Sequence, residues 1–128
     1  MTALLSIGIL ADDNFKINEA IQYFKFGIGS GNIGNGVPFI HLDPDSNEML
    51  GQCQESGRDQ GHATLCVSLL GAFCQMAKNV GEDLFIFDDG RALAMCRNGI
   101  PASTTICISS IRQIIICTGK KRRKGFTW

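Results

Sequence analysis

The fold depends most on residues 57–79, GRDQGHATLCVSLLGAFCQMAKN. Within this stretch large apolar side chains recur at three- and four-residue steps, at Leu65, Leu69, Phe73 and Met76. That spacing places them along one face of an amphipathic helix. The sequence therefore predicts a long helix over these residues, with its apolar face in the core.

Two shorter helices are predicted upstream. Thr2–Leu10 is almost wholly apolar, and Asn14–Phe26 mixes apolar with polar residues at helical spacing. Asp12 or Asp13 between them is a suitable N-cap for the second helix. Gly27–Gly36 contains five glycines that alternate with other residues, which predicts a flexible connection.

The remaining part of the first 95 residues predicts loops and one more helix. Val37–Gln54 contains two prolines and several turn residues, so we expect it to be extended or looped. Asp88 or Asp89 is expected to cap a helix that runs through Arg91–Met95. Since no alternation of apolar and polar residues competes with these helices, the predicted fold class is all-α, built from helical hairpins.

Charge is divided unevenly along the chain. Residues 1–95 contain 12 acidic and 5 basic side chains, whereas residues 96–128 contain 7 basic and no acidic ones. Thr104–Thr118 is isoleucine-rich and predicted to be strand-like, and Lys120–Lys124 is a basic run. The split is compatible with a tail that binds nucleic acid, or with two unrelated pieces of sequence joined near residue 96.

The cysteines and the N-terminus exclude several classes of protein. The six cysteines form no C-x-x-C pair and have no histidine at metal-site spacing, so we expect unpaired thiols, no metal and no cofactor. Cys66 and Cys74 lie on the apolar helix, where a free cysteine acts as a small hydrophobe. Met1–Leu10 is too short to span a bilayer and lacks the features of a signal peptide, so no membrane association is expected.

Polar residues are concentrated just before the apolar helix. If this helix begins near Gln54, then Glu55, Arg58, Asp59 and His62 share one of its faces. That face would present a carboxyl, a guanidinium and an imidazole together. Spacing alone leaves two interpretations open: a functional site, or a solvated first turn with ordinary ion pairs.

The same residues carry a resemblance to a known family. The segments that match are QCQESGRDQGH (52–62), ATL (63–65) and LGAFCQMA (70–77), together with DD (12–13), GVPFIH (36–41) and DDGRALA (88–94). Over about residues 2–95 the chain resembles the alginate-lyase-like family of (α/α)-toroid polysaccharide lyases. The resemblance implies a partial (α/α) toroid as the fold.

The resemblance also implies an activity, the cleavage of an anionic uronate polysaccharide of the alginate or glucuronan type by β-elimination. A base removes the C5 proton, an acid protonates the leaving oxygen, and other groups neutralise the carboxylate. Glu55 and His62 are the implied catalytic residues: Glu55 as a protonated donor, with burial raising its pKa, and His62 as a donor or proton acceptor. Substrate-binding or positioning roles are expected for Gln54, Arg58, Asp59, Gln60 and His41. For His41, packing in a loop is an equal alternative.

Beyond residue 95 the chain departs from the family pattern. Tyr23 is the only tyrosine and is expected to pack in the core, whereas the family uses a catalytic tyrosine further downstream. We therefore expect residues 1–95 to be a lyase fragment that is inactive alone, from a periplasmic or secreted parent. We expect residues 96–128 to be a disordered or mis-encoded basic tail, following a frameshift near Cys96. The alternative function is a small helical module whose basic tail binds nucleic acid.

Overall fold

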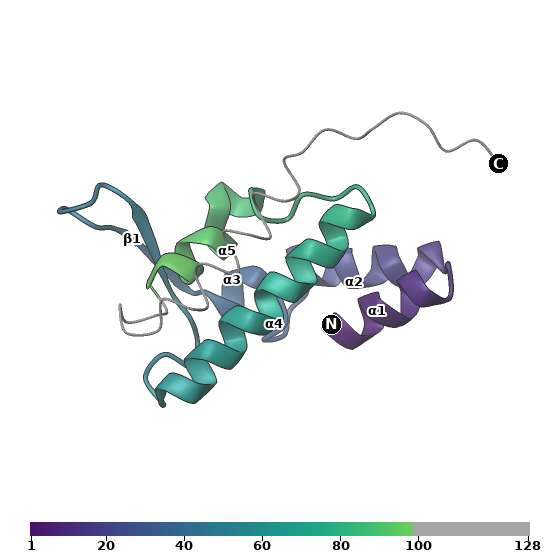
Figure 1. The fold of residues 1–128 in the computed structure, drawn as a ribbon, viewed down its shortest axis with the longest axis horizontal. Helices are drawn as coiled ribbons and strands as arrows, with labels where there is room; N and C mark the ends of the chain where they lie inside the picture. Colours follow the sequence, from purple (N-terminus) through teal and green to yellow (C-terminus); the bar gives the residue numbers. More distant parts are fainter. Residues whose placement is uncertain (99–128) are drawn as a thin grey trace.

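The structure, a computed structural model, describes residues 1–98. It is mostly helical, and Figure 1 shows α4 crossing between the α1–α2 pair at one end and a β-hairpin at the other. The elements are α1 (Thr2–Leu10), α2 (Asn14–Phe26), α3 (Ile33–Gly36), β1 (Phe39–Leu42), β2 (Met49–Gln52), α4 (Gln60–Asn79) and α5 (Phe87–Asn98). The strand predicted at 104–118, the basic run at 120–124 and most of the predicted tail lie outside the described residues.

The first two helices confirm the prediction and form a helical hairpin. Asp13, rather than Asp12, caps α2, and its carboxylate accepts hydrogen bonds from the backbone N–H groups of Phe15 and Lys16. The two helices approach closely at Gly8, where an added Cβ would lie 3.0 Å from the backbone nitrogen of Ile17. The α1–α2 hairpin packs against α4 mainly through α1.

The glycine-rich connection is ordered around the Tyr23 ring. A Cβ at Gly29 would lie 2.2 Å from the Tyr23 hydroxyl, so a larger residue there would have to displace the end of the Tyr23 side chain. The second half of the connection is helix α3, whose N-cap Asn32 accepts a hydrogen bond from the Asn35 N–H at 3.1 Å. The prediction of a flexible connection was therefore wrong for its second half, because Asn32 supplies a helix cap within it.

A β-hairpin is the main correction to the all-α prediction. β1 and β2 pair antiparallel, with Ile40 opposite Gly51 and His41 opposite Leu50. The turn is held by Asp43, whose backbone oxygen accepts from the Asn47 N–H at 2.8 Å, while Asn47 adopts a positive φ of 55°. Strands of four residues are too short to show a clear alternation of apolar and polar residues in the sequence. The sequence therefore predicted an extended or looped segment and no strand pairing.

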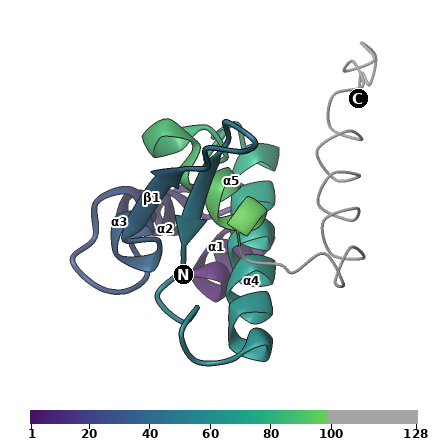
Figure 2. The same ribbon diagram turned by 90° about the vertical axis from the view of Figure 1, so that its left-hand side faces the viewer.

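The β-hairpin is held in place by contacts between β2 and α5. Seen from the hairpin end, β1 and β2 lie in front of α5, between α3 and α4 (Figure 2). The predicted capping by Asp88 or Asp89 was wrong: both, like Gly90, have left-handed backbone conformations, and helical geometry starts after them. The Asp88 carboxylate instead pairs with Arg91, whose guanidinium also donates to the Val37 carbonyl at 2.7 Å.

The core lies on one face of α4. Ala63, Val67, Cys74 and Ala77 are buried there, and Phe73 stacks on Phe24 of α2 with ring centroids 4.8 Å apart. The predicted apolar face was wrong in part, since Leu65 and Leu69 are 55% and 49% exposed. The buried stripe consists mostly of smaller side chains, which let α1 approach α4 closely. Within residues 1–98 no helix is long and apolar enough to cross a membrane.

Candidate functional site

The polar residues singled out in the sequence lie mostly in the loop that joins β2 to α4. This loop is made of tight turns, in which the Ser56 N–H donates to the Cys53 carbonyl and the Arg58 N–H donates to the Glu55 carbonyl, each at 3.1 Å. The predicted helix start, at Gly57 or near Gln54, was therefore too early. Glu55 and Arg58 precede α4, so no shared helix face aligns them with His62.

Asp59 determines where α4 begins. Its backbone is extended, with φ −166° and ψ 167°, which ends the preceding turns. Its carboxylate accepts a hydrogen bond from the backbone N–H of His62 at 2.9 Å, the standard interaction of an N-cap residue. The capping aspartate, rather than the apolar periodicity, sets the boundary.

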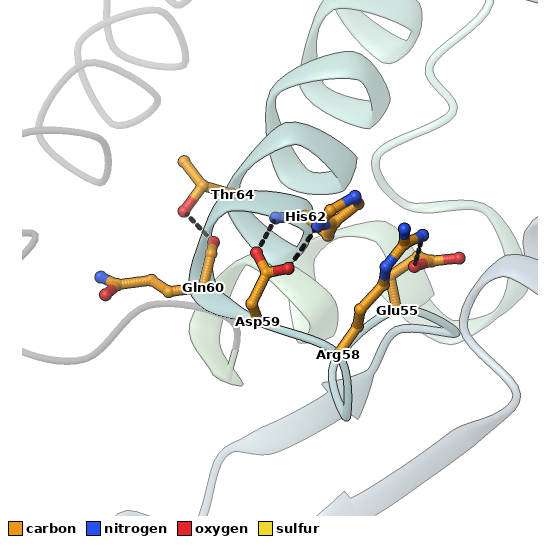
Figure 3. A network of polar contacts seen from close by, with 6 residues as sticks. All are labelled: Glu55, Arg58, Asp59, Gln60, His62 and Thr64. Carbon is orange, nitrogen blue, oxygen red and sulfur yellow. Dashed lines mark hydrogen bonds and ion pairs between the residues drawn. The ribbon is translucent and has the colours of Figure 1, made fainter.

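Two ion pairs form at this boundary. The Arg58 guanidinium lies 3.3 Å from the Glu55 carboxylate, and Nδ1 of His62 lies 2.6 Å from the Asp59 carboxylate. Figure 3 shows the two pairs at the start of α4, Asp59 with His62 and Arg58 with Glu55. The structure thus pairs four of the predicted site residues two by two, through a capped turn rather than a helix face.

Asp59 and His62 form an oriented pair. The backbone hydrogen bond from His62, and then the side-chain hydrogen bond, lower the pKa of Asp59 below its ordinary value. As a carboxylate, Asp59 can only accept a hydrogen bond, so Nδ1 of His62 is the donor and Nε2 is the second nitrogen of the ring. The His62 side chain is 39% exposed.

Glu55 has a different environment from the one predicted. Its side chain is 38% exposed and pairs with Arg58. It is half-buried rather than enclosed, because the tight turns keep it near the surface. Its carboxylate positions the Arg58 guanidinium.

A cavity of about 270 Å³ opens beside the loop. Gln54 and Glu55 line it together with apolar side chains of α2, α4 and α5, including Phe24, Leu69 and Met95. The backbone N–H of Gln54 donates to the Gly36 carbonyl at 2.9 Å, which fixes this wall. Gln54 therefore lies in the cavity wall, and its substrate-binding or positioning role stays a prediction.

Two predicted residues are not part of the group. His41 is exposed on β1, and its charge helps to lower the pKa of Asp43, after the larger effect of the Ser46 hydrogen bond. Gln60 is the first residue of α4, and its side chain points away from the His62 side of the chain (Figure 3). Its carbonyl accepts from the Thr64 hydroxyl at 2.8 Å.

Sequence reasoning missed one feature of the site. Ser30 and Asn32 bring the glycine-rich connection to the cavity, and only the polar composition of that segment indicated this. Among residues 1–98, no group of three or more His, Cys, Asp or Glu side chains is placed to hold a metal ion.

Comparison of the chain with family models, with curated proteins and with solved structures finds no match.

Proposed function

We propose that this chain is part of an (α/α)-toroid polysaccharide lyase that cleaves a uronic-acid polysaccharide by β-elimination. The observation that carries the proposal is the pairing of His62 with Asp59, in the same loop-to-helix segment as the Arg58–Glu55 pair, whose Glu55 lines a cavity. The resemblance of residues 52–62 to the alginate-lyase-like family supports the same site. The proposal includes a longer parent protein that is periplasmic or secreted.

His62 is the proposed base. Asp59 orients the imidazole through Nδ1, so the lone pair of Nε2 is available to take the C5 proton of the uronate. The electron pair of the C5–H bond then forms the C4–C5 double bond, and the glycosidic oxygen leaves C4 with the bonding pair. The acid that protonates this oxygen is assigned to no residue in the described part of the chain.

Arg58 is the proposed partner of the substrate carboxylate. Its side chain is 63% exposed and contacts Glu55 through one nitrogen, which leaves further donors of the guanidinium for a second carboxylate. Exposed ion pairs contribute little to stability, so substrate binding displaces or extends this pair at small cost. Neutralising the carboxylate makes the C5 proton more acidic and stabilises the developing negative charge.

The exposed face of α4 supports the toroid. Leu65 and Leu69 form an apolar surface that residues 1–98 leave uncovered, next to the cavity. In a toroid further helical hairpins would cover such a surface. The α1–α2 hairpin packed on α4 is compatible with one repeat of this architecture.

The described residues offer no comparable support for nucleic-acid binding. Each Lys and Arg within residues 1–98 pairs with a carboxylate, and acidic side chains outnumber these cations by 12 to 6. A nucleic-acid interaction would rest entirely on the basic run after residue 119.

Binding of uronate oligosaccharides to the 128-residue chain tests the proposal. We expect weak binding by NMR titration that Arg58→Ala abolishes and Arg97→Ala preserves. Arg97 is a matched control, because it is also exposed and also pairs with a glutamate, at 3.5 Å. Absence of binding, or binding that Arg58→Ala leaves unchanged, would contradict the role of this site.

A further inference from the structure

The cavity beside the site loop has an apolar floor that belongs to the core. Several of its lining residues are at most 4% exposed: Phe24, Ile33, Val37, Phe73 and Met95. They come from α2, α3, α4, α5 and the residue that follows α3. Leu69 of α4 also lines the cavity and is 49% exposed, so the lining extends from the core to the surface. A small molecule can therefore reach an apolar interior.

Loops supply a polar rim to the same cavity. Ser30 and Asn32 line it from the glycine-rich connection, and Gln54 lines it from the segment between β2 and α4. Asn32 is already engaged, because its side-chain amide donates to the Lys25 carbonyl at 2.9 Å and its oxygen caps α3. Ser30 and Gln54 are exposed, and within residues 1–98 their side chains form no hydrogen bond. A hydroxyl and a carboxamide are therefore available to a ligand at the rim.

The charge of the lining favours an uncharged ligand. Glu55 is the only acidic or basic residue in the described lining, and its carboxylate lies 3.3 Å from the Arg58 guanidinium. Burial raises the pKa of the Cys66 thiol, which also lines the cavity, and the nearby Cys53 and Glu55 raise it further. The surroundings of Cys66 therefore disfavour negative charge. A cation would lose hydration against the apolar floor, where no unpaired carboxylate of the described lining replaces it.

The volume of the cavity determines the size of the ligand. An apolar cavity of about 150 Å³ binds benzene. This cavity, at about 270 Å³, is nearly twice as large. We propose that it binds a small neutral molecule of two fused rings that carries one hydroxyl or amide group. The rings pack against Phe24, Phe73 and Met95, and the polar group forms a hydrogen bond with Gln54 or Ser30 at the rim. A ligand of this class has no glycosidic bond, so its binding does not depend on the proposed lyase activity.

The test titrates the 128-residue chain with 2-naphthol at neutral pH and follows binding by calorimetry. We expect a Kd of about 0.1 mM, as is usual for a ligand of this size, and binding at least about tenfold weaker for the anion 2-naphthoate. Cys66→Phe should weaken 2-naphthol binding at least about tenfold, because the added ring occupies the cavity. Ser68→Phe is the matched control, since Ser68 is exposed on the same helix and does not line the cavity. Equal affinity for 2-naphthoate, or equal effects of the two substitutions, would overturn the proposal.

A second measurement covers the case in which Cys66→Phe fails to fold. Nuclear Overhauser effects between 2-naphthol and the wild-type chain locate the bound ligand without any substitution. Met95 is 2% exposed and lines the cavity, so a contact with its methyl group requires a ligand inside. Ile86 is 71% exposed and lies outside the cavity lining, so it reports binding to the surface. We expect contacts with Met95 and none with Ile86, and the reverse result would refute the proposal.

Discussion

Replacing Gly51 by alanine tests how the hairpin is held against α5. A Cβ at this position would lie 2.7 Å from the backbone nitrogen of Met95 and 3.0 Å from the backbone carbonyl carbon of Ala94. It would also lie 2.9 Å from Cγ1 of Val37. Because the α5 backbone cannot rotate away as a side chain can, β2 must lift from the helix. Overpacking of this kind lowers the free energy of unfolding by about 1–3 kcal/mol, and we expect a loss in the upper half of that range.

The matched control is the same substitution at Gly71 in α4. An added Cβ there meets no atom within 4 Å. Alanine is the better helix former, so Gly71→Ala should stabilise the protein by about 0.5–1 kcal/mol. The two variants are identical in chemistry and are predicted to change stability in opposite directions.

Urea unfolding followed by circular dichroism measures both effects. With a slope of about 1–3 kcal/mol per molar urea for a small protein, Gly51→Ala should lower the midpoint by about 1 M. Gly71→Ala should raise it by a smaller amount. If Gly51→Ala left the midpoint unchanged or raised it, the docking of β2 on α5 would be refuted, and with it the position of the site loop that follows β2.

Three further predictions concern side chains. Asp59→Ala should lower the melting temperature more than Asp59→Asn, because asparagine keeps a cap acceptor; equal losses would refute capping. The folded-state pKa values of Asp13, Asp43 and Asp59 are lowered, so the unfolded chain binds more protons in acid. Their stabilisation is present above about pH 4 and is lost as pH falls through the folded values; urea midpoints independent of pH between 7 and 3 would contradict this. An aromatic disulfide reagent should label Cys66 before Cys74, whose thiol is buried, and simultaneous labelling would show that α4 opens there.

Local signals in the sequence predicted three of the helices in residues 1–98. The apolar run identified α1, periodicity identified α2 and the body of α4, and Asp13 was among the expected caps. The start of α4 was missed because polar residues at helical spacing continue upstream of it. Asp59, a strong N-cap residue three positions before His62, was the signal that locates it.

Features that depend on distant residues were not predictable in the same way. The hairpin is stabilised by packing of β2 on α5, more than 40 residues away in the chain, and its strands are too short to show alternation. The exposure of Leu65 and Leu69 depends on which face of α4 the α1–α2 hairpin covers.

The site itself was partly predictable. Glu55, Arg58, Asp59 and His62 are close in sequence, so any compact turn brings them together. The position of His41 depends on the pairing of β1 with β2, and that of Gln60 depends on where the first turn of α4 begins. The sequence pattern predicted neither the strand pairing nor the start of α4.

The most direct test of the central claim is an elimination assay with the longer lyase that we propose, recovered by sequencing the gene on both sides of these 128 codons. Alginate and glucuronan are supplied as substrates, and the new C4–C5 double bond is followed by its ultraviolet absorbance. The account predicts unsaturated product that His62→Ala abolishes and His41→Ala preserves. A protein that cuts and binds neither polymer, or one whose activity survives His62→Ala, would contradict it.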